Sequence, residues 1–302
     1  MSSAGLLAVA RAAARAGAEV LAERWRSHHP GVPASRDQLG AETKSSGSDW
    51  VTDYDRRAED AVRAVLRAYR PHDEITGEEH GKTVPERPSG YRWSIDPLDG
   101  TTNFVRGIPQ FACSVAVMGP AAGEGGAGAG GDGDNAEPVW WAGAVVAPAL
   151  GRSWYARRGH GAFTTVDSGA AGADLDDAGA PVRLHGPVAE RSGKLLATGF
   201  GYDPDRRARQ LEVLGALMAD FGDVRRIGSA ALDLCMVADG TLDAYAEFGT
   251  HEYDWAAGAL IAEEAGVRIE RPTHPDGTDH PSWMLAGDFD PELLHDLRGL
   301  TN

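Results

Sequence analysis

The chain has 302 residues, 42% of them hydrophobic and 25% charged, which is the balance of an ordinary globular protein rather than a disordered or fibrous one. Its formal net charge of −16 argues against a broad nucleic-acid or anionic-membrane surface, because such surfaces neutralise phosphates with Lys and Arg. No run of about 18 apolar residues and no basic leader with an apolar core occurs, so we expect a cytoplasmic protein. An acidic protein that acts on an anionic substrate must neutralise its own site, most simply with a divalent cation held by carboxylates.

The two cysteines, Cys113 and Cys235, stand in apolar segments, Phe-Ala-Cys-Ser-Val and Leu-Asp-Leu-Cys-Met. Cysteine in such surroundings is usually a small buried side chain. We therefore expect two buried thiols and no disulfide framework.

Two amphipathic helices are predicted first. Over residues 6–25 apolar side chains recur at helical spacing, and Gly17 falls on the apolar face, where it lets a neighbouring element pack closely. A second helical pattern covers residues 54–69, and Pro71 stops it. Runs rich in β-branched and aromatic residues then predict strands at 91–95, 112–118, 140–146 and 153–156.

The second half alternates between the two kinds of element. Strands are predicted at 195–198, 242–247 and 283–285, and helices at 206–220, 229–238, 254–265 and 291–297. Helices and strands interleave along the whole chain, so an α/β or α+β layered fold is expected. Length alone permits one large domain or two smaller ones.

Residues 93–104 carry the clearest chemical pattern: an apolar strand ends on Asp96, and a second acid, Asp99, follows three residues later. The intervening proline cannot continue a sheet ladder, which leaves the Leu98 carbonyl to turn toward a cation as a hard oxygen ligand of the kind that Mg²⁺ prefers. Gly100 permits a sharp turn, after which backbone amides can point at an anion. The pattern predicts metal and phosphate side by side, with an ordinary Asp-Gly turn as the alternative interpretation.

Three other acidic segments are candidates for the same site, and each has a simpler structural interpretation. Glu78 follows a strand-like step and is alternatively a solvated loop residue. Asp53 is interpreted as the N-cap of the second helix, whereas Asp55 is able to face the site. Asp254 stands at a helix start, where an N-cap is the alternative, and His251 is a poor candidate because Mg²⁺ prefers oxygen ligands.

Taken together, these blocks resemble the ordered signatures of the inositol monophosphatase family. The matching segments, whose order and spacing cover nearly the whole chain, are residues 51–55, 77–79, 96–104 and 253–258. Residues 225–247 resemble the actinobacterial inositol-1-monophosphatases in particular. The resemblance implies an αβαβα sandwich of the sugar-phosphatase type, in one domain over residues 1–302 with subregions at about 1–185 and 186–302.

The resemblance also implies two or three bound Mg²⁺ ions. One ion would be held by Glu78, Asp96 and the Leu98 carbonyl. A second would be held by Asp96, Asp99 and Asp254, so that Asp96 bridges the two. A weaker third ion near Glu78, and inhibition by lithium at the Asp254 side, are also familiar in this family. A pair of metal ions activates water and stabilises the leaving oxygen of an in-line displacement.

The same resemblance assigns the other site residues. Glu78 and Thr101 would orient the attacking water as catalytic residues, with Asp55 hydrogen-bonded to the Thr101 hydroxyl. Glu247 matches an acid that binds inositol hydroxyls, and Lys44 matches a loop residue near the metals. The implied substrate contacts are Asp99, Gly100, Thr101, Gly228, Ser229, Ala230, Glu247 and Asp254.

The clearest departure from the family pattern is the Gly- and Ala-rich segment 121–138. It is interpreted as a flexible hairpin tip rather than a phosphate loop, because no Lys-Ser/Thr follows its glycines. We expect it to lengthen a family hairpin without touching the active site. It is in a position to alter association between subunits, since the family is usually homodimeric.

The implied reaction is the hydrolysis of inositol 1-phosphate, a small phosphate monoester, to inositol and phosphate. Histidinol-phosphate phosphatase is the alternative within the superfamily: Thr102 favours the inositol type because that rival commonly carries Lys there, whereas residues 147–152 are reminiscent of the rival. An alternative of another class is a regulatory binding partner of the transcription machinery, as some bacterial relatives are. The intact set of metal ligands favours catalysis.

Overall fold

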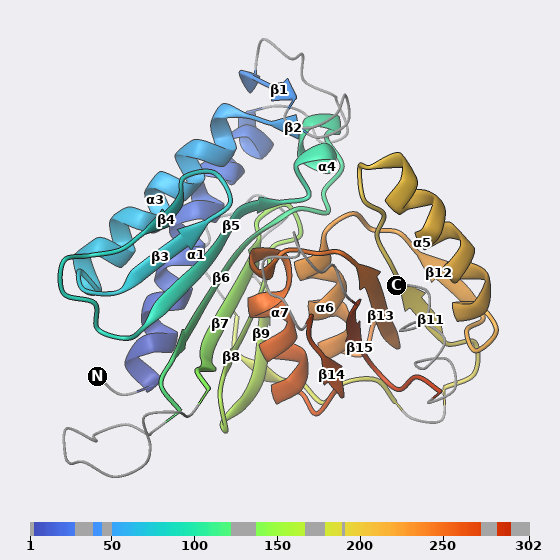
Figure 1. Cartoon of the computed structure of the whole chain (residues 1–302). Coiled ribbons are helices and arrows are strands. Elements are labelled where there is room, and N and C mark those ends of the chain that lie inside the picture. The colour runs from blue at the N-terminus through green and yellow to red at the C-terminus, as the bar shows by residue number, and fades with distance from the viewer. Residues whose placement is uncertain are drawn as a thin grey trace.

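The computed structural model describes residues 3–27, 39–43, 50–121, 137–166, 179–188, 191–272 and 283–290. Helices and sheets alternate in layers across the molecule (Figure 1). Lys44, residues 122–136 of the Gly-rich segment and the helix predicted at 291–297 lie outside the described residues. The two strands that flank the Gly-rich segment do pair with each other, as a hairpin requires.

The outer layer consists of α1 (Ser3–Ser27) and α3 (Asp53–Tyr69), which pack on each other and on the large sheet. Their contact depends on Gly17, as predicted. A Cβ atom there would lie 2.5 Å from Cys113 Sγ and 2.9 Å from Val62 Cγ2, which is closer than real Cβ contacts come. Glycine at this position therefore sets how closely α1 approaches both α3 and the sheet.

The large sheet has the strand order β10-β9-β8-β7-β6-β5-β3-β4. Neighbouring strands run antiparallel except for β3 and β5, which are parallel. Its strands are β3 (Glu74–Gly77), β4 (Gly81–Thr83), β5 (Arg92–Asp99), β6 (Ala112–Gly119), β7 (Val139–Ala147), β8 (Arg152–Arg157), β9 (Gly161–Val166) and β10 (Val182–Arg183).

Helices α6 (Ala230–Ala238) and α7 (Glu252–Glu264) pack against the large sheet, α7 across β5 to β9, and both also contact the small sheet. The small sheet has the order β12-β11-β13-β15-β14, with bounds β11 (Leu195–Ala197), β12 (Asp223–Arg225), β13 (Ala244–Phe248), β14 (Ile269–Glu270) and β15 (Trp283–Ala286). Helix α5 (Pro204–Leu217) covers its outer face through a separate apolar cluster. The layers are α, β, α, β, α, so the predicted sandwich is confirmed.

Two short elements complete the part of the chain near the strand ends. Strands β1 (Glu42–Thr43) and β2 (Trp50–Val51) form an antiparallel pair, and α4 (Thr101–Arg106) follows β5 directly. Strand β5 does not end at Asp96 as predicted. It continues to Asp99, because one extra residue on β5 is absorbed as a bulge between these two positions, and that bulge accommodates the proline that has no N–H for the ladder.

The strands that were not predicted are β1, β2, β4, β9, β10, β12 and β14. All of these except β9 have only two or three residues, too few for a residue pattern to reveal, and their pairing depends on the partner strand rather than on their own sequence. The cysteine prediction is confirmed, because Cys113 and Cys235 are buried free thiols. In the described part of the chain, no helix has both the length and the apolarity needed to cross a membrane.

Candidate active site

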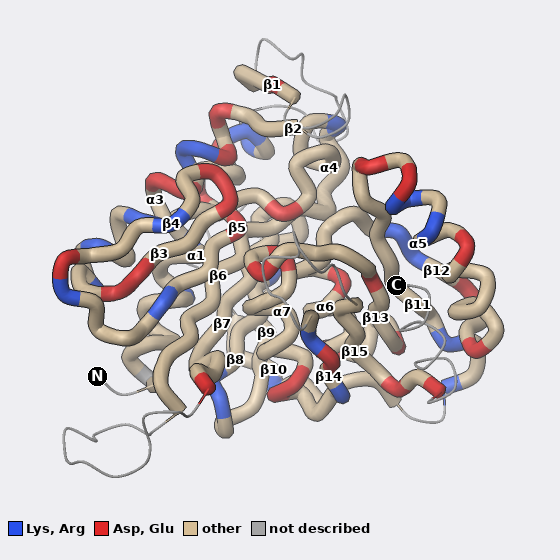
Figure 2. The backbone as a smooth tube through the Cα atoms, in the orientation of Figure 1, with Lys and Arg blue, Asp and Glu red and all other residues tan. Residues whose placement is uncertain are grey.

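A cavity of about 540 Å³ opens where β3 and β5 end and α4, α6 and α7 begin. Acidic positions come together in this part of the molecule (Figure 2). Eleven of the twelve residues assigned to the site from the sequence line it, namely Glu78, Asp96, Leu98, Asp99, Gly100, Thr101, Gly228, Ser229, Ala230, Glu247 and Asp254. The twelfth, Asp55, is fully buried and reaches the cavity only through its contact with Thr101.

The bulge in β5 brings Asp96 and Asp99 to the same cavity. In a regular strand, residues three apart point to opposite faces of the sheet. The extra residue between Asp96 and Asp99 changes that alternation, so both carboxylates reach the opening. The backbone N–H of Leu98 donates to Asp96 Oδ1 at 3.0 Å, which fixes the first of the two carboxylates.

Asp99 is held by the beginning of α6. Its Oδ2 accepts hydrogen bonds from the Ser229 hydroxyl at 2.6 Å and from the backbone N–H of Ala231 at 2.7 Å. Burial nevertheless raises the pKa of Asp99 to about 7, because the loss of water outweighs these two hydrogen bonds. The carboxylate therefore links the large sheet to the helix layer while retaining a second oxygen toward the cavity.

Asp254 is the third residue of α7 rather than its N-cap, so the capping alternative is wrong. His251 occupies the N-cap position, and its backbone N–H donates to Asp254 Oδ2 at 2.7 Å. The His251 ring stacks on Tyr253 at the edge of the cavity. Burial, followed by the charges of Asp99 and Glu78, raises the pKa of Asp254 well above its usual value.

Thr101 opens α4 directly after Gly100, whose φ of +93° is a left-handed conformation that favours glycine. The Thr101 hydroxyl lies 3.1 Å from Asp55 Oδ1 and 3.0 Å from the Leu98 carbonyl oxygen, both of which are acceptors. The predicted hydrogen bond between Thr101 and Asp55 is therefore present. A hydroxyl has one proton and two lone pairs, so its oxygen retains capacity to accept a hydrogen bond.

Asp55 belongs to the capping box that starts α3. Thr52 is the N-cap, and it donates to Asp55 Oδ2 from its backbone N–H at 2.8 Å and from its hydroxyl at 2.6 Å. The prediction that Asp53 caps this helix is wrong: Asp53 is the first helical residue and is exposed. Burial raises the pKa of Asp55 to about 7, in spite of the hydrogen bonds from Thr52 that lower it.

The four cavity acids Glu78, Asp96, Asp99 and Asp254 act on one another. Burial and then the charges of Glu78, Asp99 and Asp254 raise the pKa of Asp96 well above its usual value. Such a concentration of negative charge calls for a compensating cation. Among the described residues, no three His, Cys, Asp or Glu side chains are already arranged closely enough to hold a metal ion together. The carboxylate oxygens of these four acids are hard ligands that suit Mg²⁺.

The opposite side of the cavity carries two further acids. Glu247 on β13 accepts a hydrogen bond from the Tyr245 hydroxyl at 2.9 Å. Asp233 on α6 is 1% exposed, and its Oδ1 has no hydrogen-bond partner within the described residues. Sequence reasoning missed Asp233, although a lone acid in the otherwise apolar run of α6 is a signal that was available.

A sequence profile described as the inositol monophosphatase family matches residues 3–130 and 133–293. The chain belongs to this family. The inositol-1-monophosphatase SuhB of Mycobacterium tuberculosis (strain ATCC 25618 / H37Rv) is 43% identical over 243 residues, which are 79% of this chain and 74% of the relative.

Another bacterial protein and a solved structure also resemble this chain. The Nus factor SuhB of Pasteurella multocida (strain Pm70) is 35% identical over 262 residues, 86% of this chain and 83% of the relative. The solved structure of Mycobacterium tuberculosis SuhB matches with a TM-score of 0.68 at 32% identity and covers 99% of this chain and 96% of that one. The family and the fold predicted from the sequence are confirmed, and membership supports phosphatase activity that generally depends on Mg²⁺.

Proposed function

We propose that this chain is a Mg²⁺-dependent phosphomonoesterase that hydrolyses inositol 1-phosphate to inositol and phosphate. The observation that carries the proposal is the convergence of four acids from three separate parts of the chain on one cavity. Glu78 follows β3, Asp96 and Asp99 lie on β5, and Asp254 lies in the first turn of α7. Arg206 and Arg226 also line the cavity, but the acids outnumber them, so the cavity is suited to a substrate that arrives together with cations.

In this proposal the cation ligands are divided as the family pattern implies. Glu78, Asp96 and the Leu98 carbonyl would hold one Mg²⁺, and Asp96, Asp99 and Asp254 would hold a second, with a third weaker ion beside Glu78. Bound Mg²⁺ supplies charge stabilisation and lowers the pKa of water. Hydrogen bonds from Leu98, Ser229 with Ala231, and His251 fix one oxygen of each aspartate, which leaves the other oxygen of each for a cation.

The chain's own residues orient the attacking water. The Thr101 hydroxyl donates its proton toward Asp55 and the Leu98 carbonyl, so its oxygen is turned to accept a hydrogen bond from a water molecule in the cavity. Glu78 accepts the second hydrogen bond of that water. A water whose two hydrogens are held by acceptors keeps its lone pairs, one of which can face the phosphorus atom, and no covalent nucleophile is required.

The alcohol of the substrate lies against the other side of the cavity. In this proposal Glu247 and the nearly buried Asp233, which both line the cavity, accept hydrogen bonds from sugar or inositol hydroxyls. Gly228, Ser229 and Ala230 provide a close backbone surface between the two sides. A ring with several hydroxyls uses both acids, whereas histidinol phosphate, the alternative substrate, offers an ammonium and an imidazole instead.

A phosphate-release panel tests this proposal. Purified protein with Mg²⁺ is given inositol 1-phosphate, histidinol phosphate, fructose 1,6-bisphosphate and a nucleotide 3′-phosphate, each with and without lithium. We expect the highest kcat/KM for inositol 1-phosphate, and inhibition by lithium. Preference for histidinol phosphate would transfer the function to the alternative, and no release from any member would overturn the enzymatic proposal.

A second candidate function rests on the relatives named Nus factor SuhB, of which the Pasteurella multocida protein is 35% identical to this chain. It is a regulatory interaction with the transcription machinery. Asp96→Asn separates the two functions, because it removes a cavity carboxylate without altering the surface. Loss of turnover with retained binding to purified transcription components would show that both functions coexist. The homodimer and the cytoplasmic location stay predictions.

A further inference from the structure

Helix α3 turns a row of charged side chains toward the sheet rather than toward water. Asp55, Glu59 and Arg63 follow at four-residue steps, which places them on one face of the helix. Glu59 is completely buried and Arg63 is 1% exposed. Burying a charge costs free energy unless the charge is paired and hydrogen-bonded. We therefore expect each charged group of this row to have partners.

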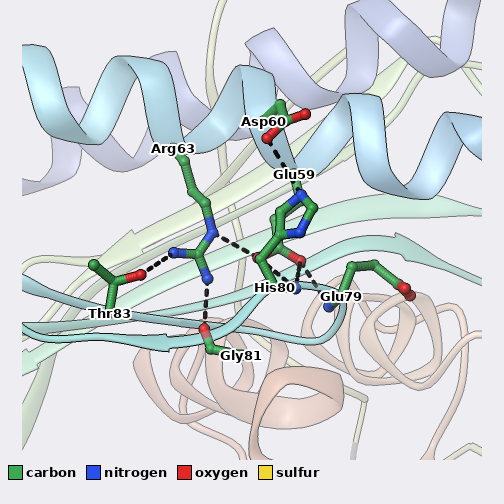
Figure 3. A network of polar contacts seen from close by, with 7 residues as sticks. All are labelled: Glu59, Asp60, Arg63, Glu79, His80, Gly81 and Thr83. Atoms are coloured by element: carbon green, nitrogen blue, oxygen red, sulfur yellow. Dashed lines mark hydrogen bonds and ion pairs between the residues drawn. The ribbon is translucent and has the colours of Figure 1, made fainter.

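Each of the three guanidinium nitrogens of Arg63 donates a hydrogen bond (Figure 3). Its Nε donates to Glu59 Oε1 at 2.6 Å. The two terminal nitrogens donate to the Thr83 hydroxyl at 2.9 Å and to the Gly81 carbonyl at 2.5 Å. The guanidinium thus neutralises Glu59 and fixes the β4 side of the turn that joins β3 to β4.

Glu59 holds the other side of the same turn (Figure 3). Its Oε2 accepts a hydrogen bond from the backbone N–H of Glu79 at 2.7 Å, and the N–H of His80 lies 3.3 Å from both carboxylate oxygens. The carboxylate fits against Gly77, where any Cβ would overlap it. The turn whose N–H groups donate these hydrogen bonds is the one that carries Glu78.

The turn is also fixed from the sheet, because the backbone N–H of Glu78 donates to the Ile95 carbonyl at 3.2 Å. Glu78 therefore stands between two attachments, one to β5 and one to α3. The attachment to α3 holds the turn in place against electrostatic repulsion, because the side chain of Glu78 faces the negative charges of Asp96 and Asp254. The exposed pair of His80 with Asp60, 3.2 Å apart, adds little because water screens it.

We propose that Glu59 is a positioning residue for Glu78: its buried carboxylate, neutralised by Arg63, holds the backbone of the 78–80 turn so that Glu78 faces the cation site. This inference rests on the proposed function. It assigns a role to a charged pair that touches neither the cavity nor a substrate. The carboxylate acts as a hydrogen-bond acceptor for two backbone donors, and its charge is balanced locally rather than used in the chemistry.

Two double variants, which differ from each other only at position 59, test this role. Glu59→Gln with Arg63→Gln keeps a neutral acceptor for Glu79 and allows the two amides to bond each other. Glu59→Met with Arg63→Gln keeps the volume but removes the acceptor. Neither leaves a buried unpaired charge, so both are suited to fold. Asp73→Asn serves as a control, because Asp73 is a buried acid that accepts from Arg70, Ser89 and Trp93 at the far end of β3.

Three readouts are taken on the intact chain: Mg²⁺ binding by calorimetry, hydrogen exchange of the amides in residues 77–81, and kcat with KM. For Glu59→Met with Arg63→Gln we expect Mg²⁺ affinity to fall by about tenfold, as for other residues that orient metal ligands, together with faster exchange of the turn amides. Glu59→Gln with Arg63→Gln should restore both to near the wild-type value. Asp73→Asn should lower stability without changing Mg²⁺ affinity.

The outcomes separate this inference from the proposed function. Wild-type Mg²⁺ affinity in the Met variant, or an equal loss in the Gln variant, would overturn the positioning role. Wild-type protein that binds Mg²⁺ but hydrolyses no phosphate ester would overturn the proposed function alone, because the binding and exchange measurements need no substrate.

Discussion

The two sides of the cavity hold their acids in different ways. On the β5 wall, formed by Asp96, Asp99 and the turn with Glu78, backbone or hydroxyl donors hold each aspartate, and backbone hydrogen bonds fix the turn. On the β13 wall, Glu247 has one hydrogen bond from Tyr245 and Asp233 has an oxygen without any within the described residues. The difference fits the proposed function, in which the catalytic acids need fixed positions and the acids that recognise a polyol need acceptor capacity that the protein itself does not use.

The largest effect is expected from Asp96→Asn on the β5 wall. Loss of the carboxylate that bridges both proposed cation sites should lower kcat by at least about 1,000-fold, because the variant loses much of the charge stabilisation at the phosphoryl group. Without divalent cation the same variant should be more stable than wild type, since Asp96 is buried among like charges. Phosphate release and urea unfolding in EDTA measure the two effects. An active Asp96→Asn protein would mean that the β5 wall is not the catalytic one.

Thr101→Ala comes next on the same wall. Removal of the hydroxyl leaves the attacking water without one of its two proposed acceptors and should lower kcat by about 100-fold, within the usual range for proton-handling groups. Thr101→Ser keeps the hydroxyl between Asp55 and the Leu98 carbonyl and should recover most of the rate. If Ser and Ala variants were equally slow, packing rather than the hydroxyl would explain the loss.

The β13 wall should respond in KM rather than in kcat. Glu247→Gln and Asp233→Asn should each weaken the proposed hydrogen bonds to substrate hydroxyls, so KM for inositol 1-phosphate should rise by about tenfold, the loss of about one hydrogen bond. Phenyl phosphate, which has no hydroxyls on its ring, is the matched control and should be unaffected. If activity toward both substrates fell equally, these acids would act in catalysis rather than in recognition of the alcohol, and the two walls would not differ in role.

The smallest expected effect is a change in the pH dependence of stability from Asp55→Asn. The folded pKa of Asp55, about 7, lies above its ordinary value of 3.8. The contribution of this group to stability is therefore fully present below pH 3.8 and is lost as pH rises through about 7. Asp55→Asn should flatten that part of the decline in the free energy of unfolding, measured in EDTA between pH 4 and 8. Parallel curves for variant and wild type would contradict the raised pKa.

Much of the β5 wall was predictable because its residues are close in the sequence. Asp96, Leu98, Asp99, Gly100 and Thr101 form one uninterrupted pattern, and the proline and glycine within it have local conformational meanings. The layered fold followed from the alternation of helical and strand periods. What the pattern did not specify was the bulge, because the register of a strand depends on its partner and not on its own residues.

The β13 wall and the helix caps were harder to predict. Asp233 lies in an apolar helix, and only the position of α6 between the two sheets reveals that it lines a cavity. Asp53 was interpreted as a cap, and a cap was the alternative interpretation of Asp254, but Thr52 and His251 take those positions. In both helices the acid at the third position instead accepts a hydrogen bond from the cap residue's N–H. Residue propensities do not distinguish which of several adjacent residues becomes the N-cap.

The spacing of Asp55 and Glu59 along α3 has a mechanical consequence. One residue contacts the hydroxyl of Thr101, and the other contacts the turn that carries Glu78, so two groups from different segments share one rigid body as their reference. If α3 tilts or slides, both groups are displaced together and the distance between them is preserved. Inserting a single residue between positions 55 and 59 would rotate one contact by about 100° around the helix axis and break that shared frame.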